Sequence, residues 1–128
     1  MKAPKLIFGL ILNLVSSILK WALQPIVYTG TMLWYIITWQ PKKMAQYNWD
    51  LALSKDQYGN VLIQLPGNSW LISKDSPYPY GNPDITISAV TGKNKVEGYT
   101  IWLGNVLCAI LDFFDKDHCI KAAENYEK

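Results

Sequence analysis

The chain has no arginine, one histidine and two cysteines among its 128 residues. Arginine makes the bidentate contacts to phosphate and guanine, so its absence argues against sequence-specific recognition of nucleic acid. Charged residues of any kind are scarce, at 17% against roughly 25% in typical soluble domains. Half of the residues are hydrophobic, so part of the apolar surface is expected to face lipid or another protein chain.

The charges that are present are unevenly distributed. Residues 1–55 contain six lysines and one acidic residue, Asp50, whereas residues 56–128 contain six lysines and nine acidic residues. The basic portion is also the hydrophobic portion. This combination fits attraction to an anionic membrane surface better than attraction to nucleic acid.

The two cysteines, Cys108 and Cys119, lie eleven residues apart in a region with a helical pattern. They form neither a disulfide framework nor a cysteine-rich zinc pattern. Unpaired cysteine behaves as a small hydrophobic residue, so we expect two reduced thiols, one of them buried. A turn between the two positions would allow them to pair.

An apolar stretch from Leu6 to Trp39 carries one charge and is long enough to cross a bilayer. We predict a helix that begins near Pro4 and is kinked or turned at Pro25, which cannot donate a backbone hydrogen bond. A narrow polar stripe at helical spacing consists of Asn13, Ser16, Ser17, Lys20 and Gln24. Such a stripe suits a helix that lies in the membrane interface or lines a helical bundle.

Three arrangements of this stretch remain open. A single tilted span would place Lys2 and Lys5 on one side of the membrane and Lys42 and Lys43 on the other. A hairpin turning near Pro25 would place all four on the cytoplasmic side, which the positive-inside tendency favours. Burial against other protein chains, as in a virion, is the third arrangement.

Tryptophans suit the contact surface in each arrangement, because their amphipathic rings favour both interfacial belts and protein interfaces. We assign the membrane or partner contact to Trp21, Trp34, Trp39, Lys42 and Lys43, with Trp49 as a further tryptophan of the same kind. Cleavage as a signal peptide is disfavoured, because Lys20 and Trp21 stand where small residues should precede a cleavage site.

The middle of the chain has few clear elements. Met44–Leu53 fits a short amphipathic helix, and residues 54–60 predict a turn. Val61–Leu65 fits a strand or a continuation of the helix; as a strand it would pair with Trp70–Ile72 in a small β-hairpin. Three prolines between residues 74 and 83 predict an extended, rigid linker.

Two short polar signatures stand on either side of an apolar helix. Residues 81–88 have the sequence GNPDITIS, and residues 115–119 have the sequence DKDHC. The helix between them, Ile101–Phe114, is apolar on almost every side, so we predict that it lies in the core. Gly104 in this helix would allow a neighbouring segment to approach closely.

The first signature is predicted to start a helix. Asparagine followed by proline favours a turn, and Asp84 or Thr86 is then placed to cap a short helix that runs through Ser88. Gly92 is predicted to end that helix.

The second signature follows a helix end that is crowded with acidic residues. Asp112, Asp115 and Asp117 stand where acids oppose the helix dipole, which marks the region as a special contact or a site. Asp117 is placed to start a further helix, with His118 and Cys119 in its first turn.

Several short elements follow one another in the second half of the chain. They are Asp56-Gln57, Asn60-Val61-Leu62, Gly81-x-Pro83-Asp84-x-Thr86-Ile87-Ser88, Gly92-Lys93, and Asp117-His118-Cys119 with Glu124. Their order resembles a set of small uncharacterised tailed-bacteriophage proteins with a G-x-P-D-E-T-I-S segment and, after a helix, a D-H-C segment. This chain departs from that pattern at Ile85, where the family has Glu, and by a long insertion before Gly81. The family has no established activity, so the resemblance implies phage origin and a compact helical unit.

In the favoured interpretation the two signatures form a structural lock. Asp84 and Thr86 cap a helix, and His118 hydrogen-bonds the Pro83-Asp84 loop, which satisfies buried polar groups. The lock residues are Asp84, Thr86, Ser88, Asp117 and His118.

Two chemical interpretations compete with the lock. In one, Cys119 is a nucleophile with His118 as its base, oriented by Asp84, although neighbours on a helix point about 100° apart. In the other, His118 and Cys119 bind zinc with one or more of Asp56, Asp84 and Asp115, although adjacent ligands are unusual for zinc.

The sequence therefore predicts a mostly α protein in three parts: an apolar helical segment (1–40), a loop-rich connector (41–80) and a small unit of short helices (81–128). We expect no cofactor and no bound metal. The favoured function is a non-catalytic bacteriophage accessory protein at the cytoplasmic face of the host inner membrane, in envelope modification, lysis support or superinfection exclusion. The alternative is a virion structural or DNA-ejection component. The expected partners are a membrane or other phage or host protein chains, homo-oligomers included, and no specific nucleic acid.

Overall fold

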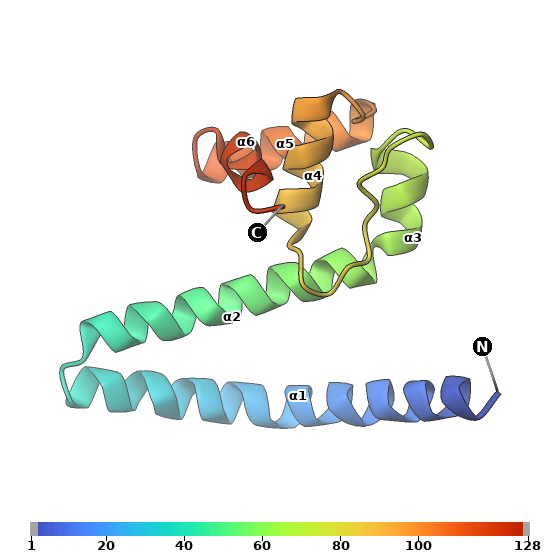
Figure 1. The fold of residues 1–128 in the computed structure, drawn as a ribbon. Helices are drawn as coiled ribbons and strands as arrows, with labels where there is room; N and C mark the ends of the chain where they lie inside the picture. The colour runs from blue at the N-terminus through green and yellow to red at the C-terminus, as the bar shows by residue number, and fades with distance from the viewer. Residues whose placement is uncertain (1–2, 127–128) are drawn as a thin grey trace. The chain divides into compact units, whose positions relative to one another are not determined.

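The computed structural model describes residues 3–126, which are mostly helical, as predicted (Figure 1). The helices are α1 (Ala3–Ile37), α2 (Pro41–Leu62), α3 (Gln64–Pro66), the π-helix η1 (Gly67–Leu71), α4 (Ile87–Glu97), α5 (Trp102–Phe114) and α6 (His118–Ala123). The chain divides between Asn48 and Trp49 into two compact units, which we call unit 1 and unit 2. Helix α2 contributes to both units.

The predicted turn at Pro25 is wrong. Helix α1 continues through Pro25 to Ile37, because the one backbone hydrogen bond that proline removes costs only about 3 kcal/mol in a helix of 35 residues. The chain turns instead at residues 38–40, where Trp39 adopts a left-handed conformation with φ of 51°. Pro41 then begins α2, a first-turn position where its missing N–H has no intrahelical partner to lose.

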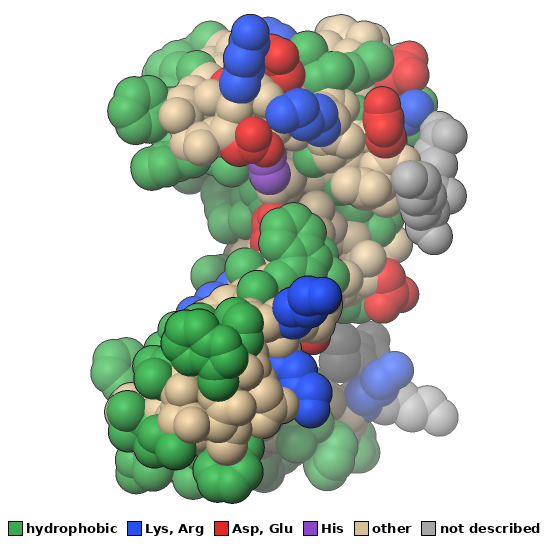
Figure 2. Space-filling model, turned by 90° about the vertical axis from the view of Figure 1, so that its left-hand side faces the viewer, with side chains coloured by type: hydrophobic (Ala, Val, Ile, Leu, Met, Phe, Trp, Pro, Cys, Tyr) green, Lys and Arg blue, Asp and Glu red, His purple; other side chains and the backbone are tan. Residues whose placement is uncertain are grey.

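Unit 1 is held together by aromatic and polar contacts between the end of α1 and the start of α2. The Tyr28 hydroxyl donates to Asn48 Oδ1 at 2.9 Å, and the ring of Tyr47 packs against those of Tyr28 and Tyr35. Hydrophobic side chains, with lysines beside them, gather around the turn between the two helices in Figure 2. Lys2, to which the sequence assigned a place beside the membrane, lies outside the described residues.

The predictions of a β-hairpin and of a loop-rich connector are also wrong. Helix α2 continues through the predicted turn at residues 54–60 to Leu62, and the π-helix runs to Leu71, so no strand forms among the described residues. The turn-forming residues are tolerated in α2 because they meet partners far away in the sequence. A Cβ atom on Gly59 would lie 2.7 Å from Ile87 Cδ1, and the side chain of Asn60 is fully buried. Extended backbone pairs at an isolated antiparallel bridge between Ile72 and Thr100.

The core of unit 2 surrounds α4. Ile72, Tyr80 and Val90 are buried together, and Ile63, Leu71, Ile85, Ile87 and Tyr126 pack around them. The prediction that Gly92 ends α4 is wrong, because α4 ends at Gly98 in the left-handed region with φ of 80°. Gly92 instead lies against α6, where a Cβ atom would come 1.9 Å from the carbonyl oxygen of Cys119.

Helix α5 is less buried than predicted. Only Gly104 and Cys108 of its residues are buried, whereas Trp102, Phe113 and Phe114 are 70%, 85% and 82% exposed. The predicted close approach at Gly104 is confirmed, since a Cβ atom there would lie 2.2 Å from the carbonyl oxygen of Leu71. Helix α5 therefore presents one face to α4, α6 and η1 and an apolar face to the surroundings.

Candidate functional site

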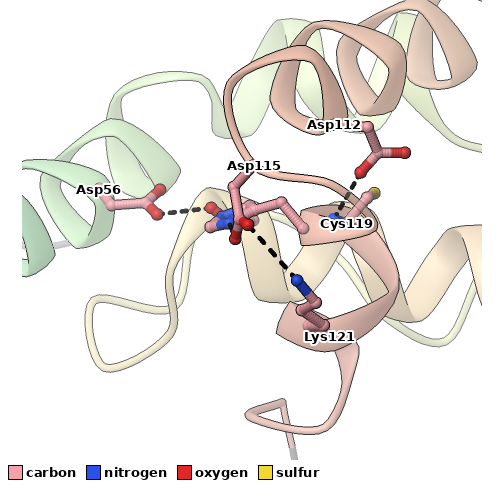
Figure 3. Close-up of polar contacts among 7 residues, drawn as sticks. Asp56, Asp112, Asp115, Cys119 and Lys121 are labelled. Atoms are coloured by element: carbon pink, nitrogen blue, oxygen red, sulfur yellow. Dashed lines mark hydrogen bonds and ion pairs between the residues drawn. The ribbon is translucent and has the colours of Figure 1, made fainter.

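The amino terminus of α4 is capped from two directions. Thr86 is the N-cap, and its hydroxyl accepts a hydrogen bond from the Ala89 N–H at 3.1 Å. Asp56 projects from α2 (Figure 3). Its carboxylate accepts from the Ile87 N–H at 2.9 Å and from the Ser88 hydroxyl at 2.6 Å. Both oxygens of a carboxylate thus satisfy groups at a helix start, where negative charge is also favoured by the helix dipole.

Asn60 fastens the loop before α4 to α2. Its side-chain amide donates to the carbonyl oxygens of Asn82 at 3.0 Å and Ile85 at 2.7 Å, and its side-chain oxygen accepts from the Gly81 N–H at 3.1 Å. Gly81 adopts φ of 121°, which is accessible to glycine at little cost. The side chain of Asn60 therefore serves three backbone groups of the GNPDI segment at once.

A second set of asparagines holds the proline-containing linker. Asn68 donates to the Tyr80 carbonyl at 3.0 Å and accepts from the Tyr80 N–H at 2.7 Å. Asn94, fully buried, donates to the carbonyl oxygens of Tyr78 and Val90 and accepts from the Ser76 hydroxyl. Side chains outside the linker therefore hold its backbone in place at Tyr78 and Tyr80.

Tyr80 is the buried aromatic residue at the centre of this network. Its hydroxyl lies 2.7 Å from the Thr91 hydroxyl, and its ring fills the space beside Gly67. Burial raises the pKa of Tyr80 above its usual value, and the hydrogen bond with Thr91 opposes that rise in part.

The start of α6 is capped by a residue other than the predicted one. Asp117 precedes α6 in a left-handed conformation with φ of 57°, and its side chain makes no cap hydrogen bond. Asp112 supplies the carboxylate from α5, and its Oδ1 accepts from the Cys119 N–H at 2.9 Å (Figure 3). Of the three acids crowded at this helix end, Asp112 is thus explained by a contact between α5 and α6.

Cys108 and Cys119 form a disulfide bond between α5 and α6, so the expectation of two reduced thiols is wrong. The turn at residues 115–117 brings their Cα atoms to 5.4 Å, within the usual range of roughly 4.4–6.8 Å. Both side chains are almost fully buried. The bonded sulfur of Cys119 is not a thiolate, which removes the observation on which the cysteine-nucleophile hypothesis rests.

His118 contacts Asp115 and not the first signature. Its Nδ1 lies 3.0 Å from Asp115 Oδ2, and Lys121 Nζ lies 3.4 Å from the other carboxylate oxygen. The hydrogen bond from His118, followed by that from Lys121, lowers the pKa of the exposed Asp115 carboxyl. The predicted hydrogen bond from His118 to the Pro83-Asp84 loop is absent among the described residues, and the Nδ1 of His118 contacts Asp115, three residues earlier in the chain.

The two signatures nevertheless line one groove of unit 2, of about 490 Å³. Asp84 and Thr86 contribute from the first signature and Asp115 and His118 from the second, with Trp49 of α2 on the apolar side. Within residues 3–126, no three histidine, cysteine, aspartate or glutamate side chains are grouped to hold a metal ion. The observed contacts around the groove are helix caps and an ion pair.

Among the described residues, the hydrogen bonds of the first signature therefore go to α2 and to its own helix rather than to the second signature. Thr86 and Ser88 make cap contacts at the start of α4, whereas the Asp84 side chain is exposed and its backbone carbonyl accepts from Gln57 Nε2 at 3.2 Å.

Sequence reasoning gave no role to the side chains of Asn60, Asn68 and Asn94, and it considered Asp56 as a zinc ligand rather than as a cap of α4. Asp112 was among the acids marked as a special contact, but its partner Cys119 was not identified. Asp56 and Asn60 have partners more than 20 residues away, so the available signal for them was their presence in the resemblance.

The residues assigned to a membrane or partner contact are all on the surface. Trp21, Trp34 and Trp39 are 84%, 61% and 83% exposed, and Lys42 and Lys43 follow them at the exposed start of α2. No family model matches this chain, and no curated protein or solved structure matches it significantly. The functional argument therefore depends on the residues of the chain itself.

Proposed function

We propose that this chain is a non-catalytic bacteriophage accessory protein that associates with a membrane through α1. One observation carries the proposal: the most apolar 18-residue window within Pro4–Ile37 has a mean hydropathy of 1.9, and none of that window is buried. A helix of this length extends about 50 Å, more than the roughly 30 Å of a bilayer's hydrocarbon core. A signal sequence has the same composition, so the anchor requires an experimental test.

The polar groups of α1 also support a lipid environment. The Ser16 and Ser17 hydroxyls donate to the carbonyl oxygens of Leu12 at 2.7 Å and Asn13 at 2.8 Å, within their own helix. Hydroxyls bonded in this way present few unsatisfied donors to hydrocarbon. Lys20 has an aliphatic stem long enough to carry its charge toward the membrane surface.

Unit 2 supports the non-catalytic part of the proposal. Asp56, Asn60, Thr86 and Ser88 belong to the elements that resemble the phage proteins, and in this chain each of them holds α4 or its preceding loop in place. Because these motif residues make structural contacts, the resemblance suggests that this chain and the phage proteins share a fold rather than a reaction. Host-envelope modification, lysis support and superinfection exclusion are the roles proposed for such a unit at the host inner membrane.

The structure does not support the expectation that the chain lies at the cytoplasmic face of the membrane. That expectation followed from a hairpin at Pro25, which would have brought the flanking lysines to one side. Because α1 continues through Pro25, the flanking lysines are separated by the whole helix.

A second candidate, a virion structural or DNA-ejection component, is favoured by the apolar face of α5. Trp102, Ile110 and Phe113 are 70%, 52% and 85% exposed on that helix, which suits burial against phage proteins or further copies of this chain. Mass spectrometry of purified phage particles tests it. Stoichiometric presence of the chain supports the virion role, and its absence from particles but presence in infected-cell membranes contradicts it.

Cell fractionation of the full chain expressed alone tests the membrane proposal. We expect the protein in the membrane pellet, resistant to alkaline carbonate and released by detergent. Recovery in the soluble fraction without detergent would contradict the anchor assigned to α1.

A further inference from the structure

The chain's only two cysteines are bonded to each other. Cys108 is on the inner face of α5 and Cys119 in the first turn of α6, with exposures of 3% and 1%. The bond therefore joins the last two helices of unit 2 inside its packed interior.

Contacts that do not involve sulfur also fix the position of Cys119. The Asp112 carboxylate accepts from the Cys119 N–H at 2.9 Å. The carbonyl oxygen of Cys119 lies against the Cα of Gly92 on α4. The packing of α4, α5 and α6 thus brings the two thiols together before they react. The pairing follows from the fold of unit 2.

Such a bond is retained where the surroundings are oxidising. Cytosolic thiol systems keep cysteines reduced, whereas disulfides persist in the bacterial periplasm and outside the cell. Its formation converts two thiols into a disulfide and releases two protons and two electrons. A protein or small-molecule disulfide of that compartment takes them up by thiol–disulfide exchange and is itself reduced to two thiols.

The lysines beside α1 do not decide its orientation. Lys2 and Lys5 precede the apolar stretch, and Lys42, Lys43 and the more distant Lys55 follow it. The positive-inside tendency depends on a difference between the flanks, and a difference of one distant lysine is small. The disulfide, rather than the lysines, indicates on which side of the membrane unit 2 lies.

We propose that unit 2 lies on the oxidising, non-cytoplasmic side of the membrane, with the amino-terminal end of α1 in the cytoplasm. This inference rests on the proposed anchoring of α1. It assigns the chain to the class of proteins whose folded part acts outside the cytoplasm, in contact with periplasmic or external components.

The redox state of the unaltered full chain is the first test. Cells that express it are quenched in acid, and the denatured protein is treated with a polyethylene-glycol maleimide before and after reduction. We expect no adduct before reduction and a shift of two adducts after it. Two adducts without reductant would overturn the inference.

The location of unit 2 is the second test. Ser69→Cys, at an exposed position of unit 2, and Ala3→Cys, before the apolar stretch, are each placed in a Cys108→Ser/Cys119→Ser background. A membrane-impermeant maleimide should label Ser69→Cys in intact cells and Ala3→Cys only after the inner membrane is permeabilised. The reverse pattern would overturn the inference, whether or not the background folds fully.

The two tests separate this inference from the proposed function. A chain found in the membrane pellet with reduced cysteines would retain the anchor and contradict the orientation. An oxidised chain found in the soluble periplasmic fraction would contradict the anchor and retain the export of unit 2.

Discussion

Asn60 shows how a single polar side chain can position a long loop. It is fully buried, and each of its three hydrogen bonds goes to backbone between residues 81 and 85. A buried amide without partners is expensive, and so are the backbone groups that it leaves unsatisfied when it is removed. The loop before α4 thus depends on a residue that is more than 20 positions earlier in the chain.

Substitution Asn60→Ala is expected to destabilise unit 2 by about 2–4 kcal/mol, because three partly buried backbone groups lose their partner. Chemical denaturation of the full chain in detergent micelles, followed by near-ultraviolet circular dichroism, measures the change. Asn125→Ala, at an exposed asparagine of unit 2, is the matched control and should change stability by less than about 0.5 kcal/mol. Equal effects of the two substitutions would contradict the role assigned to Asn60.

Tyr80 makes the stability of unit 2 sensitive to alkaline pH. Burial raises the pKa of Tyr80 in the folded protein above the ordinary tyrosine value of 10.0, so the unfolded chain loses this proton at lower pH. The stability that the neutral phenol contributes is present below the unfolded pKa and is lost as pH rises through the folded pKa.

Tyr80→Phe removes this dependence. The variant should be less stable by about 0.5–1.5 kcal/mol near neutral pH, because the hydrogen bond with Thr91 is lost. Between about pH 9 and pH 11, however, its free energy of unfolding should fall less than that of the unaltered chain. Lysine titration affects both proteins and cancels in the comparison. An identical fall in both would show that Tyr80 does not contribute.

At the residue scale, local contacts were predictable and distant ones were not. Thr86 caps α4 through a residue three positions away, and a local sequence pattern identifies such caps. Asp56 caps the same helix across 31 positions, which no periodicity or turn rule reveals. His118 is an exception among the local contacts, because its partner is Asp115, three positions earlier, and not the Pro83-Asp84 loop to which it was assigned.

Among the elements, α4 is the one on which the packing of unit 2 depends. Six of its 11 residues are buried, including Gly92 on the side that faces α6. The backbone of α6 approaches so closely there that a methyl group would meet both the Cys119 carbonyl oxygen and the Ala123 nitrogen. A glycine expected to stop a helix is instead a contact point between two helices.

Gly92→Ala should therefore destabilise unit 2 by about 3 kcal/mol, since backbone atoms of α6 have to move to admit the methyl group. Gly30→Ala is the matched control, because Gly30 has nothing within 4 Å and alanine is the better helix former. Denaturation of the two variants in micelles measures the difference. A Gly92→Ala protein as stable as Gly30→Ala would contradict the close contact between α4 and α6.

The elements also show where sequence patterns reach their limit. The long apolar helix and the short carboxyl-terminal helices follow from hydrophobic periodicity and composition. The wrong predictions at Pro25 and at residues 54–60 have one cause. Helix-breaking residues were taken to end a helix without regard to the contacts that surround them in the fold. One missing hydrogen bond does not end a 35-residue helix, and Gly59 and Asn60 stay helical because Ile87 and the loop before it pack on them.

For the molecule as a whole, the uneven composition is explained by two different environments. Helix α1 holds the long apolar surface, with exposures such as 66% for Phe8 and 72% for Ile26. Unit 2 buries asparagine, serine and threonine in satisfied networks, and no buried side-chain polar atom among the described residues lacks a partner. The proposed lipid-facing anchor, together with a unit that satisfies its buried polar groups, would account for both the low charge and the near-neutral hydropathy.

The anchor is tested at this scale by charge placed in α1. Leu14 and Ile18 lie one turn apart and are 63% and 59% exposed, so lysine at both positions leaves the internal packing intact. Each lysine in the centre of a membrane helix costs about 2.5–3.5 kcal/mol of insertion free energy. Leu14→Lys/Ile18→Lys should therefore move most of the full chain from the carbonate-resistant pellet to the soluble or aggregated fraction. The matched control, Leu62→Lys/Leu65→Lys, adds the same charge at exposed positions of unit 2 and should leave the protein in the membrane. If both double variants stay in the pellet, α1 is held by protein contacts rather than by lipid.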